Sequence, residues 1–583
     1  MVGRRWVRLA PPLTVAALTA ACFLPALSGS FLNWDDGENF LRNDAYRGLG
    51  AEQVRWAFTS VLFGHYIPLT RLTFSLNFVL GGMDPWGYHL LNLLLHAANA
   101  ALLYAVARRI LAAATGAGSQ DRRDDFDLSA SAAVAAIVFG IHPLRVEPVA
   151  WISARPDLLC ATFALLTTWA YLHAVEHPGP ARRGPMVVAA LALAAALLSK
   201  GVALSIPFAL LLLDVYPLRR LSRLGWRPLI SEKIPLWLTL VPAAIVVYGV
   251  RHETMEASPL RFDAVARVTV AAYSFVISLA RFLWPFALSP LNEMPTRISA
   301  FEPRFGFALV AAICLTGVLI VSRRRWPSGL AAWAFSVLVL APTSAALRPT
   351  TDLAPDRYSY LSGLGFAVLV GGAVLGVIRL VRRGALARPV AWVGAVAGSA
   401  VLGGLAATSW SYSEVWRQPE SLWRWAVEVD PACSVCHEKL GASILAGPGG
   451  AFRLDEAEGL FRRAIALRPD LPNAYINLGT ALIIQGRYAE AEAPLLRYIE
   501  RAPGVPLGPE RLGHAYLLQK RYADAIPLLR TAFRHAPERP PIRSDLAAAL
   551  QGRAQELRAN GRLADAEPLL AESRAVAQDG APR

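Results

Sequence analysis

The sequence predicts an all-α protein in two parts: a polytopic membrane bundle of about eleven helices over 1–409 and a helical-repeat solenoid over 410–583. Hydrophobic residues make up 55% of the 583 residues and charged residues only 17%, a balance typical of membrane proteins. Residues 1–409 alternate apolar segments with short Arg-rich stretches, whereas 410–583 has the composition of a soluble domain. A 34-residue period runs through this second part.

The first part contains eleven apolar segments that we expect to cross the membrane. They lie near 13–32, 87–107, 128–142, 157–175, 185–200, 202–217, 234–251, 305–322, 328–346, 360–380 and 389–409. Several are shorter than the ~20 residues that span the hydrocarbon layer, so their ends are approximate. Arg4, Arg5 and Arg8 before the first segment imitate a secretory signal. We expect this segment to be retained as an anchor, because it leads directly into an acidic loop and ten more spans.

Basic residues at the ends of the segments set the expected orientation. Six clusters fall on one side if the N-terminus is cytoplasmic: Arg4/Arg5/Arg8, Arg108/Arg109, Arg182/Arg183, Arg219/Arg220/Arg223, Arg323–Arg325 and Arg379/Arg382/Arg383. An odd number of spans then places the repeats outside the cytoplasm, as expected for a multi-pass protein of a bacterial inner membrane. These clusters account for much of the net charge of +15, and no basic-aromatic face indicates nucleic-acid binding.

Segment 268–289 is also apolar enough to cross, but counting it would move Arg323–Arg325 to the outer side. We therefore expect an interfacial or re-entrant helix within a long outer loop. With this topology, the outer side receives the loops 33–86, 143–156, 252–304 and 347–359. These loops carry most of the polar residues that could form a site.

The second part has the spacing of tetratricopeptide repeats. The residues that recur at 34-residue steps are Gly479 and Gly513, Tyr488 and Tyr522, Ala491 and Ala525, and Pro469, Pro503 and Pro537. Small residues let paired helices approach closely, and Pro ends each second helix. We expect about four repeats between 418 and 577, with insertions near 447–450 and 550–558. Such arrays bind extended peptides on a concave face; a passive stalk is the alternative.

Five cysteines are too few for a disulfide framework. Cys22, Cys160 and Cys314 lie in apolar segments, and we expect them to be packing residues. Cys433 and Cys436, followed by His437, have the spacing of covalent haem attachment, but they fall where the first helix of a repeat should run. We interpret the pair as ordinary helix residues, with an exposed disulfide or thiol pair and a haem site as alternatives.

Acidic side chains follow the first apolar segment at a water boundary. Asp35 and Asp36 come directly after Trp34 in the first outer loop. A carboxylate there can accept a proton from a hydroxyl nucleophile if its surroundings tune the pKa. Paired acids also suit a divalent cation, although we assign no metal ligand. The alternative is a turn capped by Asp side chains.

A polar stripe follows one face of the second span. His89, Asn92, His96 and Asn99 are spaced by three, four and three residues, which places them on the same side of a helix. Polar side chains within a membrane helix face the bundle interior. Binding of a headgroup and ties between helices are equally open interpretations.

The second outer loop contains groups that suit a phosphate: His142, Arg145, Glu147 and Arg155. Arginine can hold a phosphate by bidentate, charge-assisted hydrogen bonds. Structural pairing of Arg with Glu is the alternative. Lys200 and Arg357 add two outward-facing cations at the ends of other segments. Asp214, near the inner edge and close to Arg219 and Arg220 in sequence, is expected to be structural.

Taken together, several motifs appear in a specific order: Asn33-Trp34-Asp35-Asp36, Pro68-Leu69-Thr70, Gly87 through His96, His142-Pro143 through Trp151, Leu198-Ser199-Lys200 and Asp356-Arg357-Tyr358. This order resembles the transmembrane and tetratricopeptide repeat-containing protein family over nearly the whole chain. That family belongs with the polyprenyl-phosphate-dependent glycosyltransferases of the GT-C superfamily, near the protein O-mannosyltransferases. The resemblance implies a GT-C-like fold for 1–409.

The resemblance also implies a reaction: inverting transfer of a sugar, mannose in eukaryotic relatives, from a polyprenyl-phosphate carrier to a Ser or Thr hydroxyl of an exported protein. The lipid-linked sugar would be the donor substrate, with no certain cofactor. The catalytic base would be Asp35 or Asp36, with a slight preference for Asp36. Outer-loop cations would neutralise the departing phosphate: Arg145, Arg155, Lys200 and Arg357. His89, Asn92, His96, His142 and Glu147 complete the expected substrate-binding set.

One position departs from the family pattern. Relatives often have an Arg directly before the Pro-Leu-Thr, where this chain has Ile67, with His65 and Arg71 nearby. Donor binding is then arranged differently here, or activity is lost. Two rivals to the enzyme therefore stay open. One is a non-catalytic, membrane-anchored repeat scaffold for protein or glycan assembly, and the other is a transporter or flippase for polyprenyl lipids.

Overall fold

The structure is a computed structural model that describes residues 2–116, 122–177, 179–256, 263–344 and 351–578. Two of the stretches outside the described residues touch the expected topology. Residues 257–262 fall in the expected outer loop 252–304, and residues 345–350 cover the end of the expected span 328–346 and the start of the expected loop 347–359. The regular elements of the described ranges are helices, as predicted, accompanied by two isolated β-bridges. Contacts divide the chain into two compact units, Met1–Leu422 and Trp423–Arg583, and each is described by itself.

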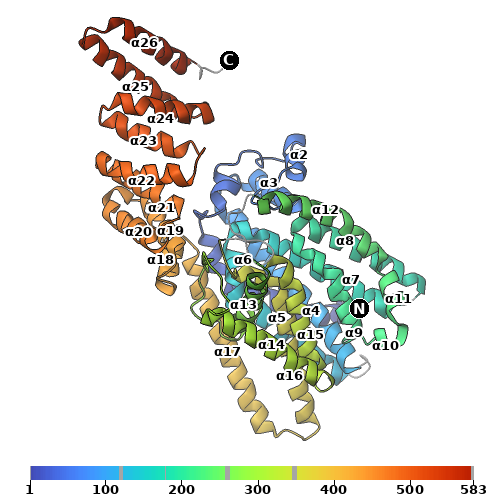
Figure 1. Cartoon of the computed structure of the whole chain (residues 1–583). Coiled ribbons are helices and arrows are strands. Elements are labelled where there is room, and N and C mark those ends of the chain that lie inside the picture. The colour runs from blue at the N-terminus through green and yellow to red at the C-terminus, as the bar shows by residue number, and fades with distance from the viewer. Residues whose placement is uncertain (1, 117–121, 178, 257–262, 345–350, 579–583) are drawn as a thin grey trace. The chain divides into compact units, whose positions relative to one another are not determined.

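The first unit is a bundle of apolar helices (Figure 1). They are α1 Val2–Cys22, α2 Ala51–Thr59, α3 Pro68–Gly81, α4 Pro85–Thr115, α5 Arg122–Gly140, α6 Val146–Ala150, α7 Arg155–Glu176, α8 Arg183–Ser199, α9 Ile206–Val215, α10 Leu221–Leu224, α11 Trp226–Ser231, α12 Ile234–Glu256, α13 Ala264–Leu283, α14 Pro303–Val321, α15 Pro327–Leu340, α16 Ser359–Arg382 and α17 Arg388–Val415. Proline within the first two positions starts many of them, because its fixed φ suits the first helical turn and its missing N–H costs nothing there.

Each of the eleven expected spans coincides with a helix of this unit, and the chain is an integral membrane protein. Seven of the described helices are long and apolar enough to cross a membrane, or eight if the pair formed by α5 and 143–150, bent by 61°, is one span. Four more are apolar but shorter. The first helix ends at Cys22, earlier than the expected 32, because a short 3-10 helix over Leu24–Ser28 follows.

The segment expected to be interfacial or re-entrant forms a single helix, α13. It belongs to the seven helices that could cross by length and composition. Its N-terminus is capped by Asp263, whose side chain accepts a hydrogen bond of 2.7 Å from the backbone N–H of Ala266. Its placement at the membrane interface stays a prediction, as does the orientation of the bundle.

Small residues allow close packing at the centre of the bundle. A Cβ on Gly140 of α5 would lie 2.2 Å from Oγ1 of Thr19 on α1, and one on Gly371 of α16 would lie 2.7 Å from the carbonyl of Ser131. Glycine is therefore required at both crossings, as is common where membrane helices pack. The surrounding core is apolar and includes Ala100.

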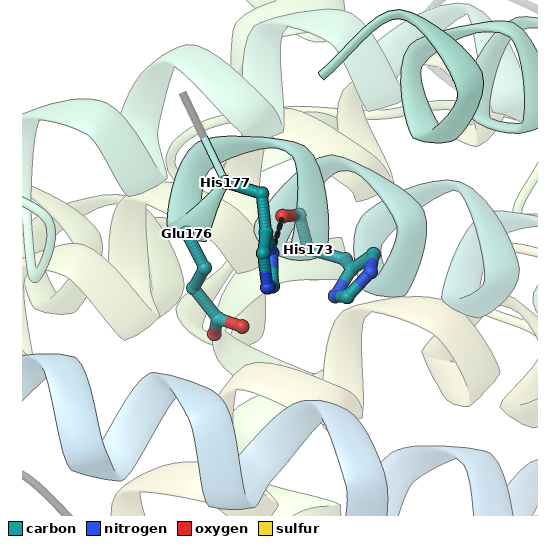
Figure 2. Close-up of side chains that lie close together, drawn as sticks. All are labelled: His173, Glu176 and His177. Atoms are coloured by element: carbon teal, nitrogen blue, oxygen red, sulfur yellow. Dashed lines mark hydrogen bonds between the residues drawn. The ribbon is translucent and has the colours of Figure 1, made fainter. Parts of the chain in front are cut away.

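Helix α7 links the two ends of the bundle. Its first turn carries Arg155 and Asp157, and its last turn carries His173 and Glu176, followed by His177 (Figure 2). It packs mainly on α8 and α4. Polar residues therefore occupy both ends of one long apolar helix.

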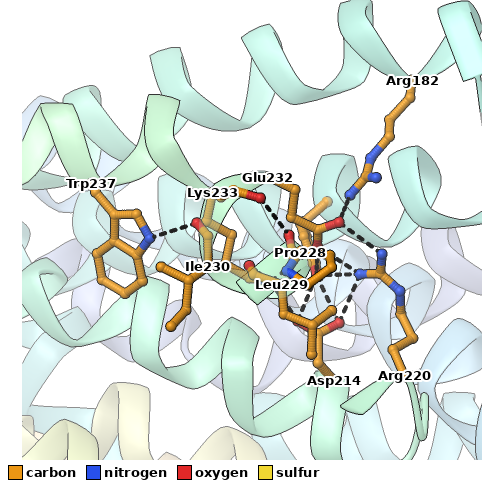
Figure 3. Close-up of polar contacts among 11 residues, drawn as sticks. Arg182, Asp214, Arg220, Pro228, Leu229, Ile230, Glu232, Lys233 and Trp237 are labelled. Atoms are coloured by element: carbon orange, nitrogen blue, oxygen red, sulfur yellow. Dashed lines mark hydrogen bonds and ion pairs between the residues drawn. The ribbon is translucent and has the colours of Figure 1, made fainter. Parts of the chain in front are cut away.

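A buried ionic network joins α7 to the α9–α12 region (Figure 3). The Lys233 ammonium contacts the Asp214 carboxylate, and both side chains are fully buried. Arg220 donates to Asp214 at 2.9 Å and to Glu232 at 2.7 Å. The hydroxyl of Tyr171 on α7 donates to Asp214 at 2.7 Å. The structural role expected of Asp214 is thus confirmed.

The second unit contains four helix pairs among its described residues (Figure 1). After α18 Pro419–Val429, which crosses the division between the units, come α19 Ser434–Ala446, α20 Leu454–Leu467, α21 Pro472–Ile484, α22 Tyr488–Arg501, α23 Leu507–Leu518, α24 Tyr522–His535, α25 Pro540–Ala559 and α26 Leu563–Gln578. A Cβ on Gly479 would lie 2.5 Å from Leu495, and one on Gly513 would lie 2.6 Å from Leu529. The recurring glycine in the first helix of a pair therefore leaves room for the leucine side chain of the second helix.

The interpretation of Cys433 and Cys436 as ordinary helix residues is wrong, because the two form a disulfide. The pair is buried rather than exposed. Cys433 is the N-cap of α19, and its sulfur accepts from the backbone N–H of Cys436 at 3.1 Å. The disulfide occupies both thiols that thioether links to haem would need. Cys314, expected to pack in the core, is exposed, whereas Cys22 and Cys160 are buried.

Replacing Lys233 by Met should lower the stability of the bundle by about 3 kcal/mol, because it removes one partner of a buried charge pair. Thermal unfolding of the detergent-solubilised protein measures the effect. Arg227→Met, which removes an exposed cation from the neighbouring α11, is the matched control and should be nearly neutral. A double variant, Asp214→Asn with Lys233→Met, should lose less than Lys233→Met alone. Equal losses would contradict the direct pairing.

The disulfide predicts a simple alkylation pattern. In the unfolded, unreduced protein, a thiol reagent should modify three cysteines, namely Cys22, Cys160 and Cys314. After reduction it should modify all five. Intact-mass spectrometry counts the labels. Five labels without reductant would show that the pair is not oxidised in the cell.

Candidate functional site

A polar cleft of about 80 Å³ opens within the first unit. Segments far apart in sequence form its walls: the loop after the first helix, the connection between α2 and α3, the start of α7, the residue after α8 and the turn before α16. Its polar lining consists of Asp35, Asn39, Asn43, Tyr46, His65, Arg71, Ser153, Asp157, Lys200, Arg357 and Tyr358. Trp56 and Trp151 line it as well.

The two adjacent acids of the first loop have different surroundings. Asp35 is partly exposed and lines the cleft. Asp36 is fully buried. Its Oδ2 accepts from the backbone N–H of Leu32 at 2.9 Å, and its Oδ1 accepts from the hydroxyl of Ser153 at 2.5 Å and from the Ser153 N–H at 3.3 Å. The geometry therefore favours Asp35, not Asp36, as the acid that can meet a substrate.

Asp36 instead fastens the first loop to the start of α7. Asn39 strengthens this tie by donating to the Ser153 hydroxyl at 2.9 Å. The indole of Trp34 stacks on Trp151, with ring centroids 4.5 Å apart. Burial raises the pKa of Asp36 from 3.8 to about 7, because desolvation disfavours the carboxylate more than its hydrogen bonds from Leu32 and Ser153 favour it.

Two cations line the same cleft, each with a carboxylate partner. The ammonium of Lys200 lies 2.6 Å from both oxygens of Asp157 and 5.2 Å from the centre of the Tyr358 ring. The guanidinium of Arg357 pairs with Glu147, whose other oxygen accepts from the Arg357 backbone N–H at 2.8 Å. Arg357 also lies 5.1 Å from the centre of the Trp151 ring. Both cations keep a small exposed fraction, 11% for Lys200 and 16% for Arg357.

Arg155, expected at the donor phosphate, does not line the cleft. Its guanidinium is fully buried and donates to Asn92 at 2.8 Å, to Asn77 at 2.6 Å and to the carbonyl of Tyr88 at 3.0 Å. It also lies over the Phe74 ring at 4.5 Å. Arg155 and Asn92 therefore hold α3, α4 and α7 together.

The histidines of the stripe and of the second outer loop also lie away from the cleft. His96 bonds to the hydroxyl of Tyr360 at 2.7 Å and to the carbonyl of Gly140 at 2.9 Å. His142 bonds to the carbonyl of Phe282 at 3.0 Å and stacks on that ring. These two residues tie helices together. His89 is buried beside the backbone of Gly29 and Ser30.

Arg145 is buried without contact to the cleft. Its guanidinium lies over the rings of Phe139 and Tyr360, at 4.7 and 5.4 Å. Its hydrogen bond to the Ser359 hydroxyl is long, at 3.4 Å, and Nε and Nη2 make none within the described ranges. Of the expected site residues, the structure thus brings together Asp35, Lys200 and Arg357, with Glu147 behind Arg357.

Several cleft residues have no role predicted from the sequence, namely Ser153, Asn39, Asn43, Asp157 and Tyr358. A signal existed for Asp157, because it stands two residues after Arg155 at a helix start, where an acid is favoured. Nothing local distinguishes Ser153 or the asparagines from other loop residues.

Ile67, the position that departs from the expected family pattern, lines the cleft. The nearby Arg71 is buried and fixes the connection that precedes it. It donates to the carbonyl and hydroxyl of Ser60 at 2.5 and 2.6 Å, and to the carbonyl of His65 at 3.2 Å. Arg71 therefore orders one wall of the cleft.

The chain is an integral membrane protein that ends in a tetratricopeptide array; residues 450–507 match the family model described as tetratricopeptide repeat. It is similar to the protein O-mannosyl-transferase Tmtc3 of Drosophila melanogaster, with 24% identity over 487 residues, covering 73% of this chain and 51% of that protein. Human TMTC4 is 34% identical over 174 residues, covering 28% of this chain and 23% of its own. The chain thus spans about half the length of the Drosophila protein and a smaller share of human TMTC4. The resemblance inferred from the motifs is confirmed.

Among solved structures, ArnT from Cupriavidus metallidurans, bound to undecaprenyl phosphate, aligns over 86% of this chain and 80% of its own length, at 16% identity and a TM-score of 0.32. MamA from Desulfovibrio magneticus aligns over 28% of this chain and 86% of its own length, at 18% identity and a TM-score of 0.23.

The raised pKa of Asp36 predicts a pH-dependent stability. The folded state holds the Asp36 proton up to about pH 7, whereas the unfolded chain releases it near pH 4. Asp36 therefore makes its full contribution to the free energy of unfolding below pH 4. This contribution is lost as the pH rises through 7, and the total loss is roughly 4 kcal/mol at most. Thermal unfolding of the wild type and of Asp36→Asn between pH 4 and 8 measures it. The stability of the wild type relative to the variant should fall as the pH rises; a difference that does not change with pH would contradict a protonated Asp36.

Proposed function

We propose that this chain is a membrane glycosyltransferase that moves a sugar, mannose by analogy with the names of its relatives, from a polyprenyl-phosphate carrier to a hydroxyl of a protein outside the cytoplasm. The observation that carries the proposal is the cleft in which Asp35 shares the walls with Lys200 and Arg357. An acid and two cations are what a base and a phosphate-leaving site require. Relatives named protein O-mannosyl-transferases support the same reaction class.

The reaction is a single displacement at the anomeric carbon. The acceptor oxygen forms a bond to this carbon as the bond from the carbon to the phosphate oxygen breaks, which inverts the configuration. Asp35 takes the proton of the acceptor hydroxyl. The polyprenyl phosphate departs with the negative charge, and Lys200 and Arg357 stabilise it.

Both cations must turn partly from their carboxylate partners to meet the phosphate. Lys200 is held by Asp157 and Arg357 by Glu147. These carboxylates keep each cation at the cleft wall while no phosphate is bound. Asp36 acts as a positioning residue, because it fixes the loop that carries Asp35 to Ser153.

The cleft must widen to admit a sugar, because 80 Å³ is smaller than the ~300 Å³ of a typical ligand pocket. The connection between α2 and α3 is the part that can move. Leu62 and His65 form an isolated bridge around Phe63 and Gly64, which both have positive φ, and the Phe63 ring is half exposed. Arg71 ties this tight turn to α3 through the carbonyls of Ser60 and His65. We expect it to act as a lid over the donor.

The repeat unit would present the acceptor. Tetratricopeptide arrays bind extended peptides, and an exported polypeptide offers hydroxyl side chains in this form. The proposal requires the cytoplasmic N-terminus and the outer repeats expected from the basic clusters. The buried disulfide of Cys433 and Cys436 supports this orientation, since disulfides persist outside the reducing cytosol.

Asp35→Asn should lower sugar transfer at least about 100-fold while the protein still inserts into the membrane, because the base is lost and the shape is kept. The assay follows label from a polyprenyl-phosphate sugar into exported proteins, in membranes from a deletion strain that carries each variant. Glu38→Gln is the matched control. Glu38 lies in the same loop but is exposed and paired with Arg42, so its loss should change transfer less than about 3-fold.

Two outcomes would contradict the proposal. Equal sugar transfer by the wild type and by Asp35→Asn would show that Asp35 is not the catalytic base. Identical glycoprotein profiles in the deletion and wild-type strains, read by mass spectrometry, would favour the non-catalytic scaffold. The scaffold has one structural observation in its favour, which is that Lys200 and Arg357 both already have carboxylate partners.

A further inference from the structure

A second group of polar side chains lies at the opposite end of α7 from the cleft. His173, Glu176 and His177 stand at positions i, i+3 and i+4, which brings their side chains to one face of the last helical turn (Figure 2). Their ligand atoms all lie within 4.8 Å of one another. His173 is separated from Asp157 by 16 residues, or roughly 24 Å of helix. The proposed transfer reaction does not use this group.

The imidazole of His177 is oriented as that of a metal ligand usually is. Nδ1 of His177 lies 3.0 Å from the carbonyl oxygen of His173, so this nitrogen donates its proton and Nε2 keeps a free lone pair. Imidazoles that bind metals commonly donate their other N–H to a backbone carbonyl in this way. Figure 2 shows this bond and the carboxylate of Glu176 on the same side of the helix. The ring centroids of His173 and His177 are 4.3 Å apart.

His173 is held in place by its neighbours. Its ring stacks on Trp169 at 5.7 Å with an interplanar angle of 10°. Its Nδ1 is buried and makes no hydrogen bond within the described part of the chain. A fixed, half-buried imidazole with an unsatisfied nitrogen is costly unless a proton donor or a cation meets it.

Glu176 supplies the third ligand and has one competitor. Its Oε2 lies 3.1 Å from the guanidinium of Arg109 on α4, so a cation at this site competes with Arg109 for the carboxylate. Arg109 is also held over the Trp169 ring, 5.2 Å from its centre. The carbonyl groups at the end of α7 add a partial negative charge that favours a cation at this position.

We propose that His173, Glu176 and His177 form a binding site for a transition-metal dication, with zinc as the first candidate. Two imidazole nitrogens and one carboxylate suit zinc, copper or nickel rather than magnesium or calcium, which prefer oxygen ligands. Water completes the coordination sphere on the exposed side. Metal binding draws Glu176 from Arg109, so it changes the contact between α7 and α4 without touching the cleft.

The test uses the full-length protein in detergent, purified through a tag without histidine, stripped with a chelator and titrated with zinc alone against a zinc-sensitive dye. The wild type should bind one tight equivalent. His173→Ala and His177→Ala should each weaken this binding at least about 10-fold, because each removes a ligand. X-ray absorption of the zinc-loaded protein should show nitrogen or oxygen neighbours at about 2.0–2.1 Å.

Two further variants make the result decisive. His535→Ala removes an exposed imidazole from the repeat unit and should leave the tight equivalent unchanged. Arg109→Gln removes the competitor for Glu176 and should tighten zinc binding. Zinc should also raise the unfolding temperature of the wild type but not of the His173→Ala, His177→Ala double variant. Equal zinc binding by the wild type and this double variant would overturn the proposal, as would weaker binding by Arg109→Gln.

Discussion

The ion pair between Glu147 and Arg357 is the interaction on which the cleft depends. Its carboxylate is almost fully buried, and it receives both the guanidinium and the backbone N–H of Arg357. A charged group inside an apolar bundle has no water to hydrate it, so a group of the protein must pair with it. This pair therefore fastens the loop before α16 to the short helix α6. Because Trp151 follows α6 and lies under the same guanidinium, the pair also positions the aromatic wall that stacks on Trp34.

The same requirement explains why two charged residues of one helical turn lie in different surroundings. Arg155 begins α7 and turns inward, where two asparagines and a carbonyl satisfy its donors. Asp157, two residues later, faces the cleft and holds Lys200. Such pairs make modest contributions to stability, because desolvation offsets much of the attraction. Their greater effect is to fix the orientation of the cationic side chain. A cation that is bound on one side by a carboxylate directs its remaining N–H donors toward the cleft.

The sequence alone predicts the helices well because their signals are local. Apolar length marks the spans, and the step from Gly479 to Gly513 marks the repeats, with a close approach of Leu495 and Leu529 as its physical cause. The site is predicted less well because its geometry is not local. Asp35 and Asp36 are neighbours in sequence, yet the fold buries one against Ser153, a residue more than a hundred positions away. Likewise, the haem-like spacing of Cys433 and Cys436 does not reveal that the first cysteine caps a helix and bonds to the second.

Helix α7 contributes to the cleft, to the Asp214 network and to the His173 group, and a helix behaves as a rigid rod over this length. Asp157 holds Lys200 at the cleft, Tyr171 joins the network of Asp214, and the His173 group ends the helix. Tyr171 joins α7 to a network in which the Asp214–Lys233 pair is fully buried, so a shift of α7 there would break a contact to buried charges. Any displacement must therefore arise at its ends, where side chains meet water. A metal at one end and a phosphate at the other would each exchange an ion pair there, of Glu176 with Arg109 and of Lys200 with Asp157, while the network between them keeps the helix in register.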